Sequence, residues 1–467
     1  MNFTTNTFFL FFIIVFFIYW LLRKTTAKNI VLLIASYIFY GWIHPWYAVL
    51  LGLSTFLDYG IALAIYRKKD DTKKLVGLSL FLNIGVLFFF KYFNFFKTPL
   101  IENLELLGIE AGYYFVSLVL PLGLSFFTLK KIGYIIDVSK GRLKPTKNFI
   151  VFNLFVAFFP QLAAGPIDKA QDLIPQFEAS RKWKWDFLYL SWRLILMGVF
   201  KKVVIANSIG SFTSRLFGLD NLTGLLAIAA ALGFTLQILA DFSAYTDISR
   251  GISFLLGIRT SENFNSPYLS LTPSDFWDRW HITLSHWLRD YVFFPLRRAF
   301  LKKRDSLPFW IIQTLPPLIT MLISGVWHGA GWTYILWGGG YGVLIVVYQL
   351  LGINKTKILR SRVQTLFAWL IMFSFIVFGW LVFRASSIEW VIDLFSHPFI
   401  GSQAQLTVAI LGLVMVLFYS APLMIKLGLD KYFSDDSFIH SVYYVVITVM
   451  IIVYINSVTP DFIYFQF

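Results

Sequence analysis

His328 lies in one of the most apolar stretches of the chain, within the sequence SGVWHGAGW at 324–332. Histidine titrates near neutral pH and is therefore the side chain best suited to moving protons in catalysis. An ionisable side chain at membrane depth is costly to bury, so its presence there indicates function. The alternative is that the imidazole only forms hydrogen bonds between helices. We take a general base at His328 as the leading hypothesis.

The glycines around His328 follow a spacing that is typical of close helix packing. Gly325 and Gly329 stand four residues apart, and small residues at this spacing let the backbones of membrane helices approach one another. A second glycine series, at 338–340 and 342, follows soon after. These glycines either bring helices together or leave room for a narrow substrate.

The other histidines give a weaker signal. His281 and His286 are five residues apart, which on a helix is a rotation of about 140°, so they cannot bind one metal ion from the same face. We interpret His44, His397 and His440 as structural. The chain also has no cysteine, so a thiolate metal site is excluded, and we predict no metal centre.

The segment 262–304 must position His281, and it mixes charged and aromatic residues densely. Thr272 is a helix N-cap, Pro273 takes the first helical position and Asp275 lies in the first turn. Helical spacing then predicts one amphipathic helix that is re-entrant or lies at the membrane surface. Its apolar stripe consists of Phe276, Trp277, Trp280, Leu284, Trp287, Leu288 and Tyr291, and it also places His281 on the apolar side. The polar side carries Asp278, Arg279, His286, Arg289 and Asp290.

Three carboxylates fall inside apolar stretches. Asp58, Asp241 and Asp247 could be ion-coupling groups of a transporter, or they could cap helices and bond to neighbouring ones. The stretch PQLAAGPIDKAQDLIPQ at 160–176 contains three prolines and predicts a broken helix that lines a cavity.

Composition places all these residues in a membrane protein. The chain has 467 residues, of which 58% are hydrophobic and 14% charged, whereas soluble domains average about 25% charged residues. We predict an all-α polytopic fold of 11 to 13 transmembrane or re-entrant helices that forms one domain over 1–467. The first apolar run, 8–22, has no basic segment before it and no cleavage site after it, so it is expected to be a retained helix.

The formal charge of +15 is distributed as the positive-inside rule predicts. Basic clusters lie at 23–28, 67–74, 130–131 and 297–304, between apolar runs, and no hydrophilic module exists that could bind nucleic acid. Placing the clusters in the cytoplasm puts the N-terminus outside. The candidate spans are 5–22, 30–43, 46–66, 75–93, 113–129, 148–164, 187–206, 223–241, 308–326, 332–351, 364–383, 405–425 and 440–457.

Two histidine blocks carry a family resemblance. FWDRWHITLSHWLRDYVFFPL at 276–296 and SGVWHGAGWTYILWGGGYGV at 324–343 resemble the membrane-bound O-acyltransferase family, in its bacterial alginate O-acetyltransferase branch. His281 in the first block and His328 in the second are 47 positions apart. The similarity covers nearly the whole chain. Further matching segments are LIASYIFYGW at 33–42, FKYFNFF at 90–96, LPLGLSFFTL at 120–129, YIIDVSKG at 134–141, FFPQLAAGPI at 158–167, DFSAYTDISRGISFLLGI at 241–258 and ENFNSPY at 262–268.

This resemblance implies a helical fold whose funnels from the two membrane faces meet at His328, with His281 as a second polar group nearby. It implies an O-acyltransferase of the bacterial inner membrane without a bound cofactor. An acetyl group would pass from a cytoplasmic thioester, acetyl-CoA, to the outside, where a partner acetyltransferase of the SGNH type places it on a polysaccharide. A covalent acyl-histidine is a less favoured variant.

The resemblance also suggests roles for the remaining candidate residues. Trp277, Trp280, Trp327 and Trp332 would exclude water, while Gly325 and Gly329 would keep the channel narrow. Asp241 is a further channel-lining candidate. Arg279 and Arg289 would meet the phosphates of the donor or of lipid headgroups.

Two kinds of alternative remain. The same fold could acetylate peptidoglycan or export D-alanine to teichoic acid. A polysaccharide or small-molecule transporter without chemistry of its own would be expected to show paired intramembrane carboxylates and repeated halves.

Overall fold

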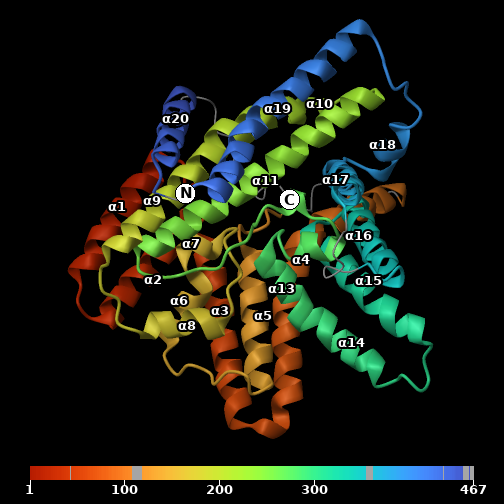
Figure 1. Ribbon diagram of the computed structural model, residues 1–467. Coiled ribbons are helices and arrows are strands. Elements are labelled where there is room, and N and C mark those ends of the chain that lie inside the picture. Colours follow the sequence, from red (N-terminus) through yellow and green to blue (C-terminus); the bar gives the residue numbers. More distant parts are fainter. Residues whose placement is uncertain (43, 108–117, 354–360, 435, 456–461, 463–467) are drawn as a thin grey trace. The chain divides into compact units, whose positions relative to one another are not determined.

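The computed structural model shows a chain that folds almost entirely into helices (Figure 1). It describes residues 1–42, 44–107, 118–353, 361–434, 436–455 and 462. Within these residues, β-structure is limited to one isolated bridge, between Phe264 and Trp280. Eight of the described helices are long and apolar enough to cross a membrane, and two more apolar helices are shorter. The predicted all-α polytopic fold is confirmed.

The α-helices have the following bounds: α1 Asn6–Leu21, α2 Thr25–Gly41, α3 Pro45–Arg67, α4 Thr72–Leu106, α5 Leu124–Ser139, α6 Phe149–Ala157, α7 Phe159–Leu162, α8 Ala170–Glu178, α9 Trp185–Phe200, α10 Asn207–Leu216, α11 Gly224–Leu255, α12 Pro273–Trp277, α13 Ile282–Leu288, α14 Phe294–Leu301, α15 Phe309–His328, α16 Trp332–Leu350, α17 Arg362–Arg384, α18 Ile388–Asp393, α19 Gln403–Tyr432 and α20 Phe438–Tyr454. Single turns of 3₁₀-helix occupy η1 Lys69–Asp71 and η4 Pro267–Leu269. The π-helical segments are η3 Lys201–Ala206 and η5 Arg289–Phe293.

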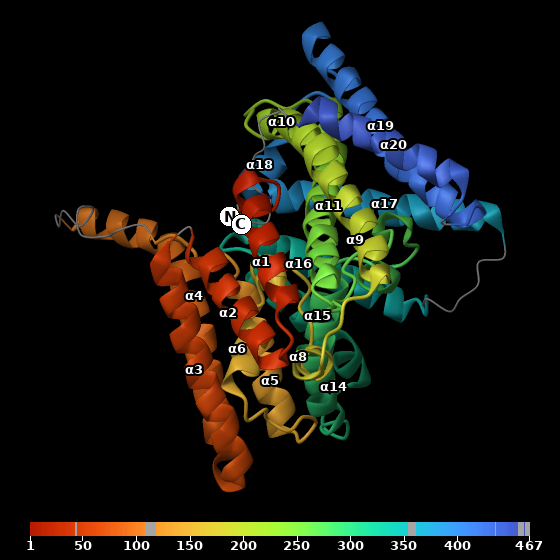
Figure 2. The same cartoon turned by 90° about the vertical axis from the view of Figure 1, so that its left-hand side faces the viewer.

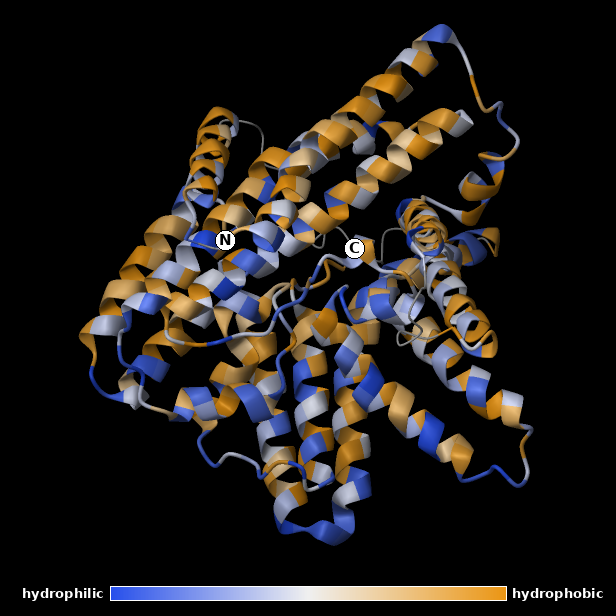
Figure 3. Ribbon diagram, in the orientation of Figure 1, coloured by the Kyte–Doolittle hydropathy of each residue, from blue (hydrophilic) through white to orange (hydrophobic). Residues whose placement is uncertain are grey.

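Most long helices carry apolar side chains on their exposed faces. Figure 3 shows hydrophobic residues along their lengths and hydrophilic ones concentrated at turns. Large exposed apolar side chains include Phe81, Leu417 and Val453. In water such surfaces would drive aggregation. They are the expected lipid-facing surface of a membrane-spanning protein, in which helices satisfy their own backbone hydrogen bonds.

The chain divides into two compact parts, residues 1–192 with 249–262, and residues 193–248 with 263–467. Helices α9 and α11 contribute residues to both. The predicted single domain over 1–467 stays a prediction.

In the first part, α4 packs against α3 and α5 (Figure 2). A buried polar group joins these three helices. Asp58 of α3 accepts hydrogen bonds from Ser79 at 2.5 Å and Asn83 at 2.8 Å, both on α4, and pairs with Lys131 of α5 at 3.2 Å. Of the two readings open for Asp58, the structure supports bonding between helices.

The positions of Lys130 and Lys131 correct two predictions. These are the span at 113–129 and the cytoplasmic basic cluster at 130–131 that was expected to follow it. Residues 108–117 lie outside the described residues, but α5 begins only at Leu124 and continues past both lysines, which are buried. Lys130 donates a hydrogen bond to the Gln161 side chain at 3.0 Å. The two lysines therefore belong to the interior of the first part, and they do not mark a loop between spans. Charge counting alone cannot distinguish a buried, paired lysine from one in a loop.

The stretch 160–176 is a broken helix, as predicted, although Pro175 lies inside α8. Helix α6 ends at Ala157, a single turn forms α7, and α8 starts only at Ala170. The intervening Asp168 is buried and accepts a hydrogen bond from the backbone N–H of Ser261 at 3.2 Å. The break thus serves to place a buried carboxylate.

In the second part, α15 and α16 form a tight hairpin (Figure 1). Gly325 faces the backbone of Tyr334 and Gly338, and a Cβ added to Gly338 would lie 3.1 Å from Gly325 Cα. A Cβ on Gly329 would overlap the Tyr334 ring. The predicted close packing at Gly325 and Gly329 is confirmed, and this contact fixes the end of α15, where His328 lies.

Gly338→Ala should weaken the hairpin, because its new methyl group would overlap the carbonyl oxygen of Met321. We expect a loss of about 1–3 kcal/mol, typical of overpacking, measured as a lower melting temperature of the purified protein in detergent. Gly339→Ala is the matched control, since its Cβ would meet only Leu322 Cδ2, at 3.5 Å. Equal melting temperatures for the two variants would contradict this account.

Candidate functional site

The segment that carries His281 is not the single amphipathic helix that the sequence predicts. Thr272 does cap the helix start, accepting a hydrogen bond from the Asp275 N–H at 3.1 Å. Helix α12 nevertheless ends at Trp277, and α13 begins at Ile282. His281 sits at the break with φ 41°, in the left-handed region. Non-glycine residues adopt this conformation at a cost of about 1–2 kcal/mol, so surrounding contacts must hold it.

Those contacts come from the segment ENFN at 262–265. Its Asn263 carbonyl accepts the Ile282 N–H at 3.0 Å, and its side-chain oxygen accepts the Thr283 hydroxyl at 2.7 Å. Phe264 forms the bridge with Trp280. A helical wheel cannot reveal this break, because the segment that causes it lies earlier in the chain. The wheel still placed His281 on a buried side, and the residue is 1% exposed.

His328 is the last residue of α15 and is 8% exposed. Three aromatic rings surround its imidazole nearly at right angles. The ring centroids lie 4.9 Å from Trp327, 5.1 Å from Trp337 on α16 and 5.4 Å from Phe383 on α17. Three helix segments thus meet at one imidazole in a largely apolar enclosure.

Trp327 links the two predicted histidines. Its ring centroid lies 4.9 Å from that of His328 and 6.4 Å from that of His281. His281 also contacts Phe242 of α11, at 4.8 Å between centroids. The structure therefore brings His281 close to Trp327 and His328, from which it is far apart in the sequence.

Burial sets the protonation state of His281, which lies outside the spanning helices. Removal from water lowers the pKa of its imidazole from 6.5 to about 3, although a hydrogen bond to its own backbone acts in the opposite direction. The ring is therefore neutral at physiological pH. A neutral imidazole can donate and accept hydrogen bonds, but it does not titrate near pH 7.

Aromatic residues form a continuous wall beside the histidines. Trp280 packs on Trp380 of α17 with centroids 4.7 Å apart, and Trp337 lies 5.9 Å from Trp380. Trp277 and Tyr341 complete the wall, 5.1 Å apart. Sequence analysis did not assign Trp337, Tyr341, Trp380 or Phe383, although the i, i+4 spacing of Trp337 and Tyr341 places both on one helical face.

Three other predicted site residues lie apart from this wall. Trp332 is 65% exposed at the start of α16, and its water-excluding role stays a prediction. Arg279 pairs with Asp275 at 2.9 Å, and Arg289 pairs with Asp278 at 3.4 Å. Both guanidinium groups are partly exposed, and their contact with donor phosphates stays a prediction.

The carboxylates of α11 are paired with lysines of the π-helical segment η3. Lys202 Nζ lies 2.8 Å from Asp241 Oδ1, with both side chains almost fully buried. Lys201 pairs in the same way with Asp247 and bonds to Ser243 at 2.9 Å. The Phe462 ring lies 4.4 Å from Lys202 Nζ. Asp241 thus supports the segment that carries Phe242, which contacts His281.

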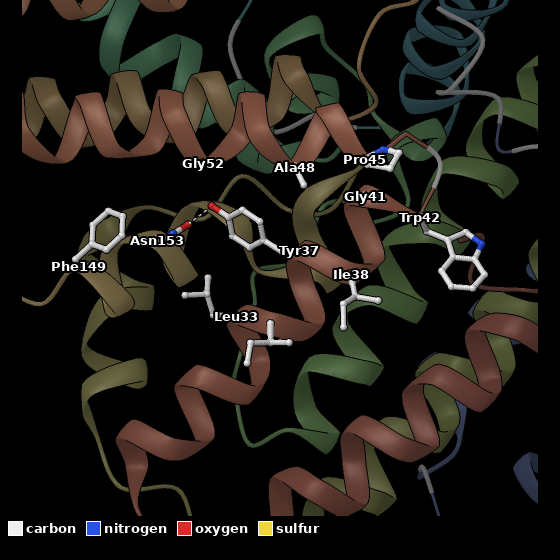
Figure 4. A pocket seen from close by; sticks show the side chains of 11 residues that line it. Leu33, Tyr37, Ile38, Gly41, Trp42, Pro45, Ala48, Gly52, Phe149 and Asn153 are labelled. Carbon is white, nitrogen blue, oxygen red and sulfur yellow. Dashed lines mark hydrogen bonds between the residues drawn. The ribbon is translucent and has the colours of Figure 1, made fainter.

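The described residues contain no cluster of three or more histidine, aspartate or glutamate side chains that could hold a metal ion. A cavity of about 760 Å³ does open in the first part, between α2, α3 and α6. Figure 4 shows its wall of apolar side chains and the hydrogen bond, 2.9 Å long, that Tyr37 donates to Asn153. None of its lining residues is a carboxylate, histidine or lysine, so this cavity offers no group that titrates near neutral pH for acid–base catalysis.

Comparison with known proteins identifies the family. The family model for MBOAT, the membrane-bound O-acyltransferase family, matches residues 139–388. The chain belongs to the membrane-bound O-acyltransferase family. It is an O-acyltransferase and a multi-pass membrane protein, and the matched region includes both histidine blocks.

Three curated relatives illustrate the range of this family. "Probable alginate O-acetylase AlgI" of Pseudomonas aeruginosa is 37% identical over 394 residues, which cover 83% of this chain and 73% of that protein. "Peptidoglycan O-acetyltransferase" of Helicobacter pylori is 35% identical over 78% of this chain and 73% of that protein. "Teichoic acid D-alanyltransferase" of Bacillus subtilis is 32% identical over 57% of this chain and 69% of that protein. The alginate-type branch that the motifs indicate is confirmed.

Lys202→Met should destabilise the protein by about 3–5 kcal/mol, because it leaves the buried Asp241 carboxylate without its cation. Adding Asp241→Leu should restore much of the lost stability, since replacing both partners of a buried pair is often neutral. Thermal unfolding in detergent measures both effects.

Arg304→Met is the control for the loss of a cation, because Arg304 pairs with Asp305 on the exposed surface. Exposed pairs contribute about 0–1 kcal/mol, so this variant should unfold like the parent. A Lys202→Met protein as stable as the parent would contradict the assigned pairing.

Proposed function

We propose that this protein takes an acetyl group from a cytoplasmic thioester, acetyl-CoA, and passes it across the membrane for O-acetylation of an extracytoplasmic polysaccharide. The acetylating relatives support this assignment, since they align with 83% and 78% of the chain. The observation that carries the mechanism is the position of His328, at the end of α15 inside an aromatic enclosure formed by Trp327, Trp337 and Phe383.

In this mechanism His328 is the general base. Its unprotonated ring nitrogen takes the proton of the acceptor hydroxyl while the oxygen attacks the thioester carbonyl carbon. The carbon–sulfur bond then breaks, and the proton passes from the imidazolium to the leaving thiolate. The products are an ester and a free thiol, with no net gain or loss of protons. General base assistance of this kind contributes about 10²–10⁴-fold to the rate.

The aromatic enclosure serves this chemistry in two ways. Bulky rings exclude water, which would otherwise hydrolyse the thioester. A rigid wall also holds donor and acceptor in line, and such positioning can contribute more than proton transfer does. The α15–α16 hairpin supplies the rigidity, because Gly325 and Gly338 lock its backbones together.

His281 has a supporting role in this proposal. Its neutral ring, held on the other side of Trp327, would orient a substrate by hydrogen bonding. The histidine that titrates during turnover would be His328. The acceptor would be reached from outside, with the N-terminus on that side and an SGNH-type acetyltransferase completing the transfer at the bacterial inner membrane.

The D-alanyltransferase relative defines the alternative substrate. That protein aligns with a smaller share of the chain than the acetylating relatives do, so we favour acetyl as the acyl group. A strain that lacks this protein should lose acetyl esters from its surface glycan. If the strain lost D-alanyl esters instead, the transferred group would be D-alanyl and not acetyl, and the mechanism would still hold.

His328→Ala should abolish acyl transfer, because it removes the group that takes the hydroxyl proton in this mechanism. The assay follows acetyl-CoA consumption and ester formation by the purified protein in lipid nanodiscs, and a drop of at least about 10²-fold is expected. His44→Ala is the control, since that exposed histidine starts α3 without a side-chain capping bond. A His328→Ala protein that transfers acetyl as fast as the parent would refute the mechanism.

His281→Asn should slow transfer only in part, because asparagine keeps a neutral hydrogen-bonding side chain. The low pKa of His281 also means that the acid limb of the pH–rate profile should be the same in this variant and the parent. Profiles of kcat/KM against pH measure both. Complete loss of activity in a folded variant, or a displaced acid limb, would assign His281 a direct part in proton transfer.

A further inference from the structure

Two buried hydrogen-bond donors on α16 have no hydrogen-bond partner. The indole N–H of Trp337 and the hydroxyl of Tyr341 belong to side chains that are 2% and 0% exposed, and neither finds an acceptor among the described residues. Buried polar groups are nearly always hydrogen-bonded, and an unsatisfied one costs about 1–3 kcal/mol. Two such donors one helical turn apart therefore indicate that an acceptor is supplied from outside the protein.

Both donor residues border the space next to Gly379 of α17. A Cβ added to Gly379 would lie 3.2 Å from Tyr341 Cε2, 3.5 Å from Tyr341 Oη and 3.7 Å from Trp337 Cδ1, the ring carbon bonded to the indole nitrogen. The Tyr341 ring already comes close to this position, so a larger residue would fill the space and press on the ring.

This space adjoins His328. The Trp337 ring that provides one donor lies 5.1 Å from the imidazole between centroids. Trp277 packs against both donor residues, at 5.8 Å from Trp337 and 5.1 Å from Tyr341, and its own indole nitrogen also has no hydrogen-bond partner. Phe375 also packs against Tyr341, with ring centroids 5.0 Å apart. The space is thus lined by aromatic rings and neutral donors.

We infer that Trp337 and Tyr341 bind the carbonyl oxygen of a short acyl thioester and stabilise the negative charge that develops on it. This inference rests on the proposed function, since it assigns a site to the acyl donor. When the acceptor oxygen attacks the carbonyl carbon, the carbonyl electron pair moves onto the oxygen. That charge would be held by the N–H and O–H until the carbon–sulfur bond breaks and the thiolate leaves.

The chemistry of the two groups determines which ligand atom they fit. An indole N–H can only donate, so the ligand atom beside it must be an acceptor. Neutral donors in a water-excluded space stabilise a developing oxyanion strongly, because they are already oriented and need no reorganisation. A Cβ on Gly379 would already press on the Tyr341 ring, so a two-carbon acyl group suits this site better than a long chain.

Tyr341→Phe and Trp337→Phe should each lower kcat for acetyl transfer by about 10²–10³-fold, the loss found when one oxyanion donor is removed. KM should change little, and Tyr341→Phe should not lower the melting temperature, because no protein hydrogen bond is lost. Tyr443→Phe is the matched control. Its hydroxyl bonds to the Pro422 carbonyl at 3.2 Å, so this change should affect stability and leave kcat unchanged.

A spectroscopic measurement separates carbonyl binding from a packing role. With ¹³C-carbonyl acetyl-CoA bound to His328→Ala in nanodiscs, the infrared carbonyl band should shift to lower frequency than in water. Adding Tyr341→Phe should reverse part of that shift. Gly379→Ala should weaken acetyl transfer by filling the space.

The outcomes also distinguish this inference from the proposed function. If the parent transfers acetyl and His328→Ala does not, while Tyr341→Phe and Trp337→Phe match the parent in kcat and carbonyl band, the inference is wrong and the proposed function stands. If the parent does not consume acetyl-CoA, the proposed function and this inference both fail.

Discussion

The backbone contact between α15 and α16 is the constraint on which the site depends. Gly325 and Gly338 have no side chains, so the two helices approach until backbone meets backbone. This contact fixes His328 at the end of one helix and carries Trp337 and Tyr341 on the other. His328, Trp337 and Tyr341 thus share one rigid hairpin, and a methyl group in the wrong place would displace them together.

Two carboxylates buried in the helical interior are each paired with a buried lysine. Asp58 is held by Lys131 in the first part, and Asp241 by Lys202 in the second. Such pairs contribute little net stability compared with apolar replacements, but breaking one is costly. The Lys202–Asp241 pair lies beside Phe242, which contacts His281. The pair therefore matters mainly because it fixes α11 next to the site, and less because of the stability that it adds.

Sequence reasoning could predict the helical class and most spans, because long apolar runs have few alternatives. Helices α16 and α17 lie within two residues of their predicted bounds. Sequence reasoning failed where contacts between residues far apart in the chain override the local sequence pattern. Asn263 and its neighbours break the expected helix at His281, and Asp58 draws Lys131 into the interior. His328 could be singled out as a candidate by its residue type, but Trp337 and Tyr341 resemble ordinary core aromatics until their hydrogen bonding is known.

The central claim is that one imidazole serves a donor on one side of the membrane and an acceptor on the other. The most direct measurement places the protein in sealed vesicles, with radiolabelled acetyl-CoA on one side only and a soluble hydroxyl-bearing glycan, together with the partner acetyltransferase, on the opposite side. The account predicts labelled acetyl esters on the glycan while the coenzyme stays in its own compartment. Labelling only when donor and acceptor share a compartment would contradict it.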